Sequence, residues 1–232
     1  MTITTGMVGH GFYDRHSAPQ RAATEAVVPW LEDAVAAMEL ADPPRAIGIA
    51  DFGCSEGANS TEVLQRLITR LRTRTSRPVL TLQNDLPTND FSSLLQRLRP
   101  AGGDGSVFGE GVFSAVVGGS MFEQLLPPGS LHLATTFNAI GFLSRRPLDR
   151  LPGYILPDGP SAMRGAGTVS AAERQTFARQ AAQDLEAFLR ARAVELVPGG
   201  RLLVEVFGVD GEARTCDGLY DVLNDAVLEA LA

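Results

Sequence analysis

The fold of this chain follows from one short segment, which reads Ile49-Ala50-Asp51-Phe52-Gly53-Cys54-Ser55-Glu56-Gly57-Ala58-Asn59. An apolar strand ends at Asp51, two glycines follow, and a helical pattern begins near Asn59. Gly53 lets the chain turn because it carries no Cβ, and Gly57 leaves room for a ligand at the helix start. In an open α/β sheet, ligands bind at the carboxyl ends of strands, beside such turns. The segment therefore predicts a nucleotide-type site after the first strand.

The spacing of the acidic residue and the two glycines in this segment limits which ligand it can bind. It reads Asp-x-Gly-x-x-x-Gly, whereas dinucleotide-binding turns read Gly-x-Gly-x-x-Gly. An acidic residue in this place suits a cofactor that carries a cationic amino group and no phosphate, such as S-adenosyl-L-methionine. A glycine-rich turn that binds nothing is the alternative, and the segment alone leaves both open.

Composition excludes several functions. The chain has 232 residues, of which 44% are hydrophobic, enough for one globular α/β domain with a full core. Its net charge of −7 argues against nucleic acid as a partner. All 20 basic residues are arginine. Without lysine, neither a Schiff base nor a Walker A phosphate loop can form.

Cysteine and histidine usage point to a cytoplasmic protein without a metal. Cys54 and Cys216 form no disulfide framework. The N-terminal segment lacks the basic start and apolar core of a signal peptide, and no apolar run is long enough to cross a membrane. His10, His16 and His132 show no metal-ligand spacing, so no metal site is predicted.

A second acidic residue ends the second predicted strand, residues 78–85. At this position of a doubly wound sheet, a carboxylate such as that of Asp85 accepts hydrogen bonds from ribose hydroxyls. Dinucleotide enzymes share that acid. The pair Asp51 and Asp85 therefore indicates an adenosine-type ligand without deciding which one.

The remaining chain alternates strands and helices. Residues 1–16 are expected to be a loose arm, and Ser17 can cap a helix that Pro29 kinks or divides. Further strands are predicted at 112–117, 130–138 and 201–207, the last after a Pro-Gly-Gly turn; helices are predicted after the first strand, at 88–99, at 171–197 and from Leu219 onwards. The expected core side of the long helix consists of Phe177, Ala181, Leu185, Leu189 and Leu196. Residues 145–168 form a long Pro- and Gly-rich loop, which predicts a functional or mobile segment.

Several blocks, taken in order, resemble the SABATH family of S-adenosylmethionine-dependent methyltransferases, as a bacterial-type member. These enzymes methylate carboxyl groups of small acids, such as salicylate, or ring nitrogens. The segment Phe12–Gln20 resembles the family's entrance pattern, and Asn84-Asp85-Leu86-Pro87-Thr88-Asn89-Asp90-Phe91 matches its most specific block. The blocks Gly119–Pro127 and Glu195–Arg201 match two more. The resemblance implies an α/β, Rossmann-like class I methyltransferase fold with a mostly parallel twisted sheet flanked by helices.

The resemblance also implies site residues. Asp85 would hold the ribose hydroxyls, Asp51 would act on the polar side of the cofactor, and Ser120 with Met121 would lie against adenine. The full set expected at the cofactor comprises Tyr13, Ser17, Asp51, Gly53, Asn59, Asp85, Leu86, Ser120 and Met121. Gln20 matches a glutamine whose amide donates to the substrate carboxylate, although by itself it reads as an exposed first-turn residue.

Two departures from the family bear on the acceptor. Phe142 stands where plant carboxyl methyltransferases carry a tryptophan, and phenylalanine has no donor. Asn138 stands where a tyrosine is usual, and it could supply an amide donor instead. Gln20, Asn138 and Phe142 are thus the expected substrate-binding residues. The chain also ends at Ala232, where the family continues through the last strands and a helical cap, so a cleft open around residues 145–168 is expected.

The predicted function is transfer of a methyl group from S-adenosyl-L-methionine to the carboxylate of a small-molecule acid, leaving S-adenosyl-L-homocysteine. An ionised carboxylate needs no general base, so the protein only positions the reactants. The alternatives are methylation of a nitrogen or hydroxyl, a cofactor-binding homologue with little catalysis and, disfavoured by the loop spacing, a NAD-dependent dehydrogenase. Residues 1–40 are expected to form an arm and substrate-gating helix, and 41–232 the cofactor-binding domain. A homodimer is left open.

Overall fold

The computed structural model describes residues 9–40, 46–100, 105–148 and 170–210, with residues 213–214 and the single positions 222, 226 and 229. The chain divides into two compact units: a larger one of Thr5–Phe142 and Leu185–Glu205, and a smaller one of Met1–Thr4, Leu143–Asp184 and Val206–Ala232. The division falls within helix α5 (Ala171–Glu195). The described part of the smaller unit contains a short antiparallel pair, β6 (Val209–Asp210) and β7 (Ala213–Arg214).

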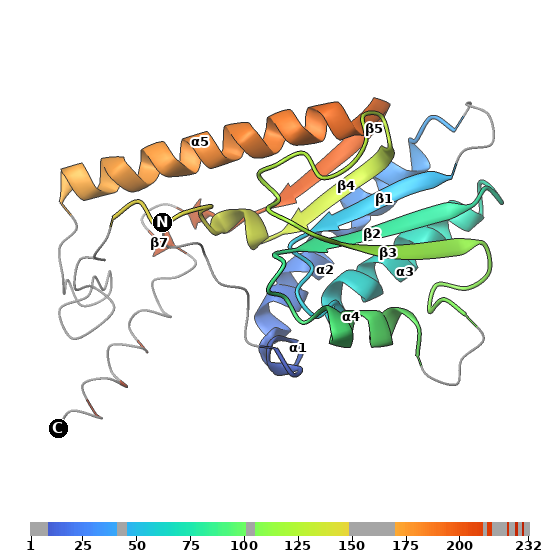
Figure 1. The fold of residues 1–232 in the computed structure, drawn as a ribbon, viewed down its shortest axis with the longest axis horizontal. Coiled ribbons are helices and arrows are strands. Elements are labelled where there is room, and N and C mark those ends of the chain that lie inside the picture. Colours follow the sequence, from blue (N-terminus) through green and yellow to red (C-terminus); the bar gives the residue numbers. More distant parts are fainter. Residues whose placement is uncertain are drawn as a thin grey trace. The chain divides into compact units, whose positions relative to one another are not determined.

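The larger unit is built on a five-stranded parallel sheet with the strand order β3-β2-β1-β4-β5 (Figure 1). The strands are β1 (Ile47–Phe52), β2 (Val79–Asp85), β3 (Val112–Gly118), β4 (Leu131–Phe137) and β5 (Leu196–Glu205). This parallel α/β architecture confirms the predicted fold class. The order reverses on either side of β1, and such a switch point is where ligands bind in open α/β sheets.

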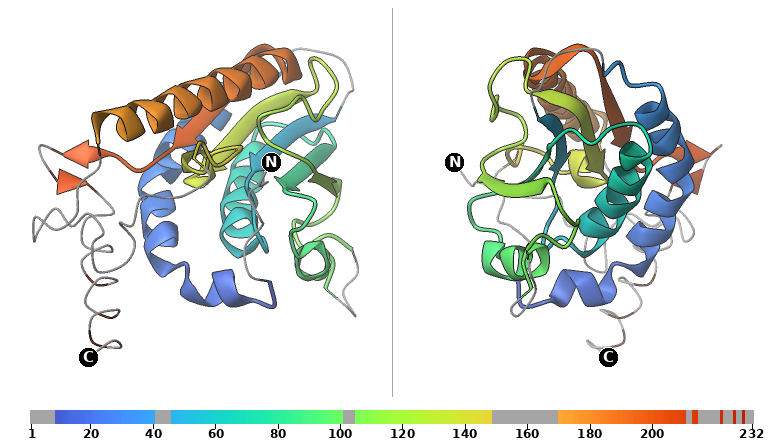
Figure 2. Two further views of the ribbon diagram at one scale, coloured as in Figure 1. Left: turned by 60° about the vertical axis from the view of Figure 1, so that its left-hand side comes forward. Right: turned by 90° about the vertical axis from the view of Figure 1, so that its right-hand side faces the viewer.

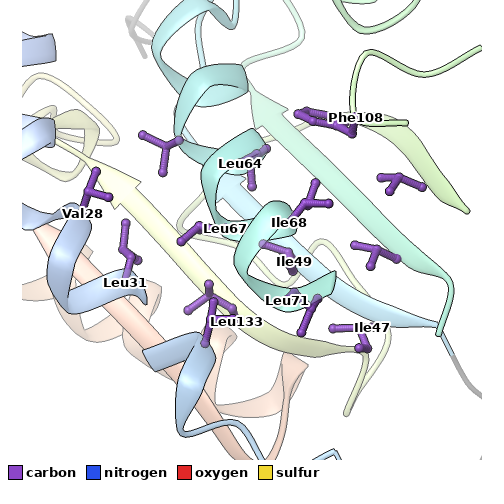
Figure 3. Packing of buried hydrophobic residues seen from close by; sticks show 14 of the residues in the cluster. Val28, Leu31, Ile47, Ile49, Leu64, Leu67, Ile68, Leu71, Phe108 and Leu133 are labelled. Carbon is purple, nitrogen blue, oxygen red and sulfur yellow. The ribbon is translucent and has the colours of Figure 1, made fainter. Parts of the chain in front are cut away.

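Helices α2 (Ala18–Ala36), α3 (Ala58–Arg72) and α4 (Phe91–Leu98) cover one face of the sheet. Two of them, α2 and α3, lie side by side (Figure 2). Their buried side chains meet those of the strands in one apolar cluster, which includes Val28, Leu31, Ile47, Ile49, Leu64, Leu67, Ile68, Leu71, Phe108 and Leu133 (Figure 3). The helix predicted after the first strand is confirmed as α3.

The opposite face is covered differently. The C-terminal half of α5 contributes Phe188, which packs against Ala50, Phe52 and Leu82 of the sheet. Beside it lies the connection between β3 and β4, residues 119–130, which crosses this face without forming a helix. Its apolar side chains Met121, Phe122, Leu125 and Leu126 pack against this second cluster.

Four predictions about local structure are wrong or incomplete. The arm expected to be loose contains helix α1 (Phe12–His16). Ser17 occupies the position before α2, but its side chain makes no cap bond, and Pro29 does not divide that helix. Strand β5 begins at Leu196 and includes the Pro-Gly-Gly segment. The pairing of β5 with β4 has a shift in register at this point.

The buried face of α5 is also not the predicted one. Leu185 and Leu189 are exposed, and Ala181 with them. The buried positions are Gln180, Asp184, Phe188, Ala191, Arg192 and Glu195. Charged and polar side chains therefore face inward on this helix, each with partners: Asp184, for instance, accepts from the backbone amide and the hydroxyl of Ser144 at 2.8 and 2.7 Å.

Some predictions fall outside the described residues: Cys216, the helix predicted from Leu219 apart from its three described positions, and most of the loop at 145–168. Across the part of the chain that the structure describes, no helix is both long and apolar enough to traverse a bilayer.

Candidate active site

Asp51 lies near the end of the central strand and is buried. Thr135 of the neighbouring β4 donates its hydroxyl to Asp51 Oδ1 at 2.9 Å. Burial raises the pKa of the Asp51 carboxyl to about 6, against the lowering effect of the hydroxyl groups of Ser60 and Thr135. A carboxylate in such a place is costly to ionise without a cationic partner, so Asp51 is suited to meet the cationic group of a ligand.

Asp85 ends β2, beside the turn that follows β1. Its two carboxylate oxygens accept backbone hydrogen bonds from Ser55 and Leu86, each at 2.7 Å. Burial raises the pKa of Asp85, and these two bonds lower it. Since each carboxylate oxygen can accept more than one hydrogen bond, Asp85 can hold the turn and still accept from ligand hydroxyls.

The block 84–91 holds the glycine-rich turn in place. The backbone amides of Gly53 and Cys54 donate to the carbonyl of Asn84 at 2.8 and 3.0 Å. Ser55 adopts a positive φ of 51°, which is uncommon for a residue with a side chain. Asp85 binds its amide, and Asn89 Nδ2 donates to its carbonyl at 2.8 Å, so the two residues together stabilise this conformation.

The start of the chain reaches the same place. Asn59 Nδ2, in the first turn of α3, donates to Ser17 Oγ at 3.2 Å. Burial raises the pKa of the Tyr13 phenol, the charge of Asp51 adds to this, and a side-chain hydrogen bond with Asn59 lowers it. The structure thus brings Tyr13, Ser17, Asn59 and Asp51 together, as the prediction requires of neighbours in one site.

Ser120 and Met121 follow β3 on the other side of the turn. Asn84 Nδ2 donates to the carbonyls of Val117 and Gly119 at 2.9 and 3.0 Å, which fixes the end of β3. The Met121 methyl group lies close to Gly53, since a Cβ added at Gly53 would be 3.3 Å from it. The same Cβ would be 2.1 Å from Cβ of Ala139.

The three expected substrate residues have different surroundings. Gln20 Oε1 is buried and has no hydrogen-bond partner. Asn138 is buried and adopts a positive φ of 60°, and its Nδ2 donates to Glu205 Oε1 at 2.9 Å. Phe142 is 59% exposed. One of the two Asn138 amide hydrogens is therefore engaged by a carboxylate within the protein.

The arrangement fits an adenosyl cofactor with a cationic end. The carboxylates of buried Asp51 and half-buried Asp85 lie beside the turn, and the backbone approaches other groups closely at Gly53. Gln20 Oε1 and Ser55 Oγ are among nine buried side-chain atoms of the described residues that have no partner within the protein, and a bound polar ligand could supply one for these two. Within the described ranges, no group of His, Cys, Asp and Glu is placed to hold a metal ion.

Sequence reasoning missed several residues that build this site. Thr135 binds Asp51, Asn89 binds the turn, and the buried carboxylate of Glu56 accepts from the backbone amides of Gly11 and Asp14. Asp14 also pairs with Arg97 of α4. Asn89 and Glu56 lie inside the segments already singled out, and Thr135 lies in the strand predicted at 130–138, whose polar end indicates a pocket wall. Arg97 gave no such signal.

Comparison with known proteins agrees with this geometry. The chain matches curated plant enzymes: "Paraxanthine methyltransferase 2" of Arabidopsis thaliana (32% identity, 87% of this chain, 58% of that protein) and "Salicylate carboxymethyltransferase" of Clarkia breweri (30% identity, 90% and 58%). The chain thus spans less than two thirds of the length of these relatives. Among solved structures it resembles "Loganic acid methyltransferase with SAH", with a TM-score of 0.76 and 24% identity over 99% of this chain and 67% of that one, which shows a shared fold.

A family description covers nearly the whole chain. The family "SAM dependent carboxyl methyltransferase" matches residues 2–232. Two of the blocks that carried the resemblance, residues 12–20 and 84–91, contact the turn and helix start that follow β1. This chain therefore belongs to the family of S-adenosylmethionine-dependent carboxyl methyltransferases.

Proposed function

We propose that this protein transfers a methyl group from S-adenosyl-L-methionine to the carboxylate of a small-molecule acid. The observation that carries the proposal is the pair of carboxylates, buried Asp51 and half-buried Asp85, at the carboxyl ends of adjacent strands in a chain of this family. Asp51 would accept from the cationic amino group of the cofactor, and Asp85 from its ribose hydroxyls.

The remaining cofactor residues would enclose the ligand. Tyr13, Ser17 and Asn59 form a polar group at the start of α3, next to Asp51. Ser120 and Met121 would bound the adenine, and Leu86, whose amide binds Asp85, would lie beside them. The close approach at Gly53 leaves no space for a side chain in the turn.

In methyl transfer to a carboxylate, the main task of the protein is to position the donor and the acceptor. When bound, the cofactor supplies an electrophilic methyl group on a sulfonium sulfur. A carboxylate acceptor is ionised near neutral pH, so no residue need remove a proton. The contribution of this chain is to align the acceptor in line with the methyl group and to exclude water, which accounts for a large share of such rate enhancements.

Gln20 would orient the acceptor. Its side chain lies in the first turn of α2, and its buried carbonyl oxygen has no partner within the protein. Its amide nitrogen can donate to a carboxylate oxygen. Relatives of this chain include a loganic acid O-methyltransferase and a salicylate carboxymethyltransferase, which supports a small organic acid as substrate.

A ring-nitrogen acceptor is the second candidate. The observation that favours it is Glu205, whose carboxylate binds Asn138 and lies close to the expected acceptor side of the site. A carboxylate there would accept a hydrogen bond from a neutral heterocycle and would repel an anion. A relative named for paraxanthine methylation is 32% identical to this chain.

A methyl-transfer assay tests the proposal. The protein is incubated with labelled S-adenosyl-L-methionine and a panel of aromatic, indole and fatty acids, together with xanthines. We expect a methyl ester that mild alkali cleaves, and a rate nearly constant from about pH 6 to pH 8, because a carboxylate with a pKa near 4 is ionised throughout. An alkali-stable product, with a rate rising about tenfold per pH unit, would assign a nitrogen or hydroxyl acceptor instead.

Four further predictions accompany this proposal. Residues 1–40 would gate the substrate; what supports this is that Tyr13 and Ser17 lie beside Asn59 at the start of α3. Light scattering would test for a homodimer, and fractionation of the source cells would test for a cytoplasmic location. The bacterial type of the chain stays a prediction that its genomic context would test.

A further inference from the structure

Two charged residues of α5 form an ion pair inside the protein. Arg192 and Glu195 are both fully buried. Arg192 Nε donates to Glu195 Oε2 at 2.8 Å, and Nη2 donates to Oε1 at 3.0 Å. Burial lowers the pKa of Arg192, against the raising effect of Glu195. Removing two charges from water costs more than one such contact returns, so the pair needs further partners.

All the other hydrogen bonds of the pair go to the backbone of one segment. Arg192 donates to the carbonyls of Met121 and Glu123, each at 2.9 Å. Glu195 Oε1 accepts from the amides of Leu125 and Leu126, at 2.6 and 2.9 Å. The pair therefore satisfies four backbone groups of the connection between β3 and β4.

The need for these bonds follows from the fold. A connection between parallel strands usually forms a helix, which satisfies its own backbone. Residues 119–130 cross the sheet without one, so the polar groups that face the interior need partners from elsewhere. The forked guanidinium of Arg192 and the carboxylate of Glu195 supply them from a neighbouring helix.

The pair also touches the strand that carries Asp51. The Arg192 guanidinium carbon lies 3.8 Å from the centre of the Phe52 ring and 5.0 Å from that of Phe188. Phe52 is the last residue of β1 and directly precedes Gly53. One side chain thus contacts both the segment that carries Met121 and the strand that leads into the cofactor turn.

We propose that the Arg192–Glu195 pair positions residues 120–121 against the adenosine part of the cofactor. The inference rests on the proposed function, which places Ser120 and Met121 at the adenine. Arg192 binds the carbonyl of Met121 itself, at 2.9 Å, so the pair acts directly on the residue expected to contact the ligand. It touches no ligand atom and acts as a positioning device.

A purely structural role and a positioning role make different predictions. If the pair only stabilises the fold, its loss lowers the melting temperature and leaves the affinity of the folded protein unchanged. If it positions the adenine side, its loss weakens every ligand that contains the nucleoside. Ligands with and without the amino-acid end should then lose affinity by the same factor, because Asp51 is not disturbed.

The test uses two ligands and matched variants. S-adenosyl-L-homocysteine and 5′-methylthioadenosine, which lacks the amino-acid end, are titrated into the wild type, Arg192→Met and Glu195→Gln. Leu71→Ala controls for stability: Leu71 is buried in the last turn of α3, far along that helix from its site end. Asp51→Asn controls for the amino-acid end. Arg192→Lys, which keeps the charge and loses the fork, is the milder variant if Arg192→Met does not fold.

We expect Arg192→Met to weaken both ligands by about tenfold or more, by equal factors, since several charge-assisted hydrogen bonds are lost at once. Glu195→Gln should weaken both less, and Asp51→Asn should weaken S-adenosyl-L-homocysteine alone. Wild-type affinities for both ligands in Arg192→Met and Arg192→Lys, with a melting temperature lowered as in Leu71→Ala, would overturn the inference. Failure of the wild type to bind either ligand would overturn the proposed function and this inference with it.

Discussion

The side-chain amide of Asn138 donates a hydrogen bond to the carboxylate of Glu205 across 2.9 Å, where β4 and β5 end. Glu205 also accepts from the hydroxyl of Thr24 at 3.3 Å, one helical turn after Gln20. A negative charge therefore lies next to the residues expected to hold an acidic acceptor.

Glu205→Gln should improve the handling of acidic acceptors. The substitution keeps the size of the side chain and an oxygen for Asn138, and it removes the charge that repels an anion. We expect KM for acid substrates to fall by about three- to tenfold, because one repulsive charge, partly screened by solvent, is removed. We expect kcat to change little. Steady-state kinetics would measure this. Glu62→Gln, which removes a surface charge paired with Arg21, is the control and should change neither constant. A higher KM in Glu205→Gln would show that the charge assists binding, as a neutral heterocycle requires.

Binding of S-adenosyl-L-homocysteine should depend on pH through Asp51. The pKa of this carboxyl is raised from 3.8 to about 6, so the free protein retains a proton there that a cationic ligand would displace. We expect affinity to increase from pH 5 to pH 7, by at most about tenfold per unit, with proton release that calorimetry in buffers of different ionisation enthalpy can detect.

The same residue should reduce the stability of the free protein. Because the folded state binds this proton more tightly than the unfolded chain, the contribution of Asp51 to the free energy of unfolding falls as pH rises from about 4 to 6. Asp51→Asn should therefore raise the melting temperature at pH 7 while weakening the ligand and flattening its pH profile. Asp85, whose pKa is also raised by burial, stays in place in this variant. A pH profile unchanged by Asp51→Asn would assign the titration to Asp85.

Two glycine substitutions separate backbone strain from crowding. Gly53 and Gly129 both have positive φ, 84° and 61°, so alanine strains the backbone at either position. An added Cβ would lie 2.1 Å from Ala139 Cβ at Gly53, whereas at Gly129 it would meet nothing within 4 Å. We expect Gly53→Ala to lower the free energy of unfolding by about 1–3 kcal/mol more than Gly129→Ala, and to weaken the cofactor. Denaturant titration measures the difference, and equal losses would mean that the turn at Gly53 has room to move.

Gln20→Leu tests the donor to the acceptor. Leucine keeps similar bulk without the amide, so kcat/KM for a carboxylate acceptor should fall by about ten- to a hundredfold. Phe142→Trp tests the opposite change: it restores an indole donor, and Phe142 is exposed enough to be replaced by a larger ring. It should raise kcat/KM for small aromatic acids. If kcat/KM were unchanged in both variants, the acceptor would bind away from Gln20 and Phe142.

The strands and the site turn could be predicted because their signals are local. An apolar run ending in an acid and two glycines specified β1, and the block 84–91 specified the neighbouring residues. The bonds among Asn84, Asp85, Asn89 and the turn show why those residue types occur together. Helix α1 could not be predicted from local sequence, because its conformation depends on contacts with residues that are distant in the sequence. Its start is held by Glu56, far away in sequence.

The error at α5 has one cause. Periodicity assigns apolar residues to the core, and it therefore placed Leu185 and Leu189 inward. The helix buries Arg192 and Glu195 instead, because a connection without a helix lies across that face and needs hydrogen-bond partners. The hydrophobicity pattern of α5 does not predict these buried charges, because they serve the unpaired backbone groups of another segment, residues 119–130.

The identity of the cofactor is tested by calorimetric titration of S-adenosyl-L-homocysteine into the wild type and Asp85→Ala, with NAD as the competing ligand. The wild type should bind S-adenosyl-L-homocysteine at one site and should not bind NAD. Asp85→Ala should lose about 2 kcal/mol or more, roughly thirtyfold in affinity, because ligand hydroxyls lose a charged acceptor and Ser55 loses its anchor. Asp90→Asn, at an acid of the same block that caps α4, is the control and should bind normally. Binding of NAD in place of S-adenosyl-L-homocysteine would make the cofactor a dinucleotide, and wild-type affinity in Asp85→Ala would remove Asp85 from the site.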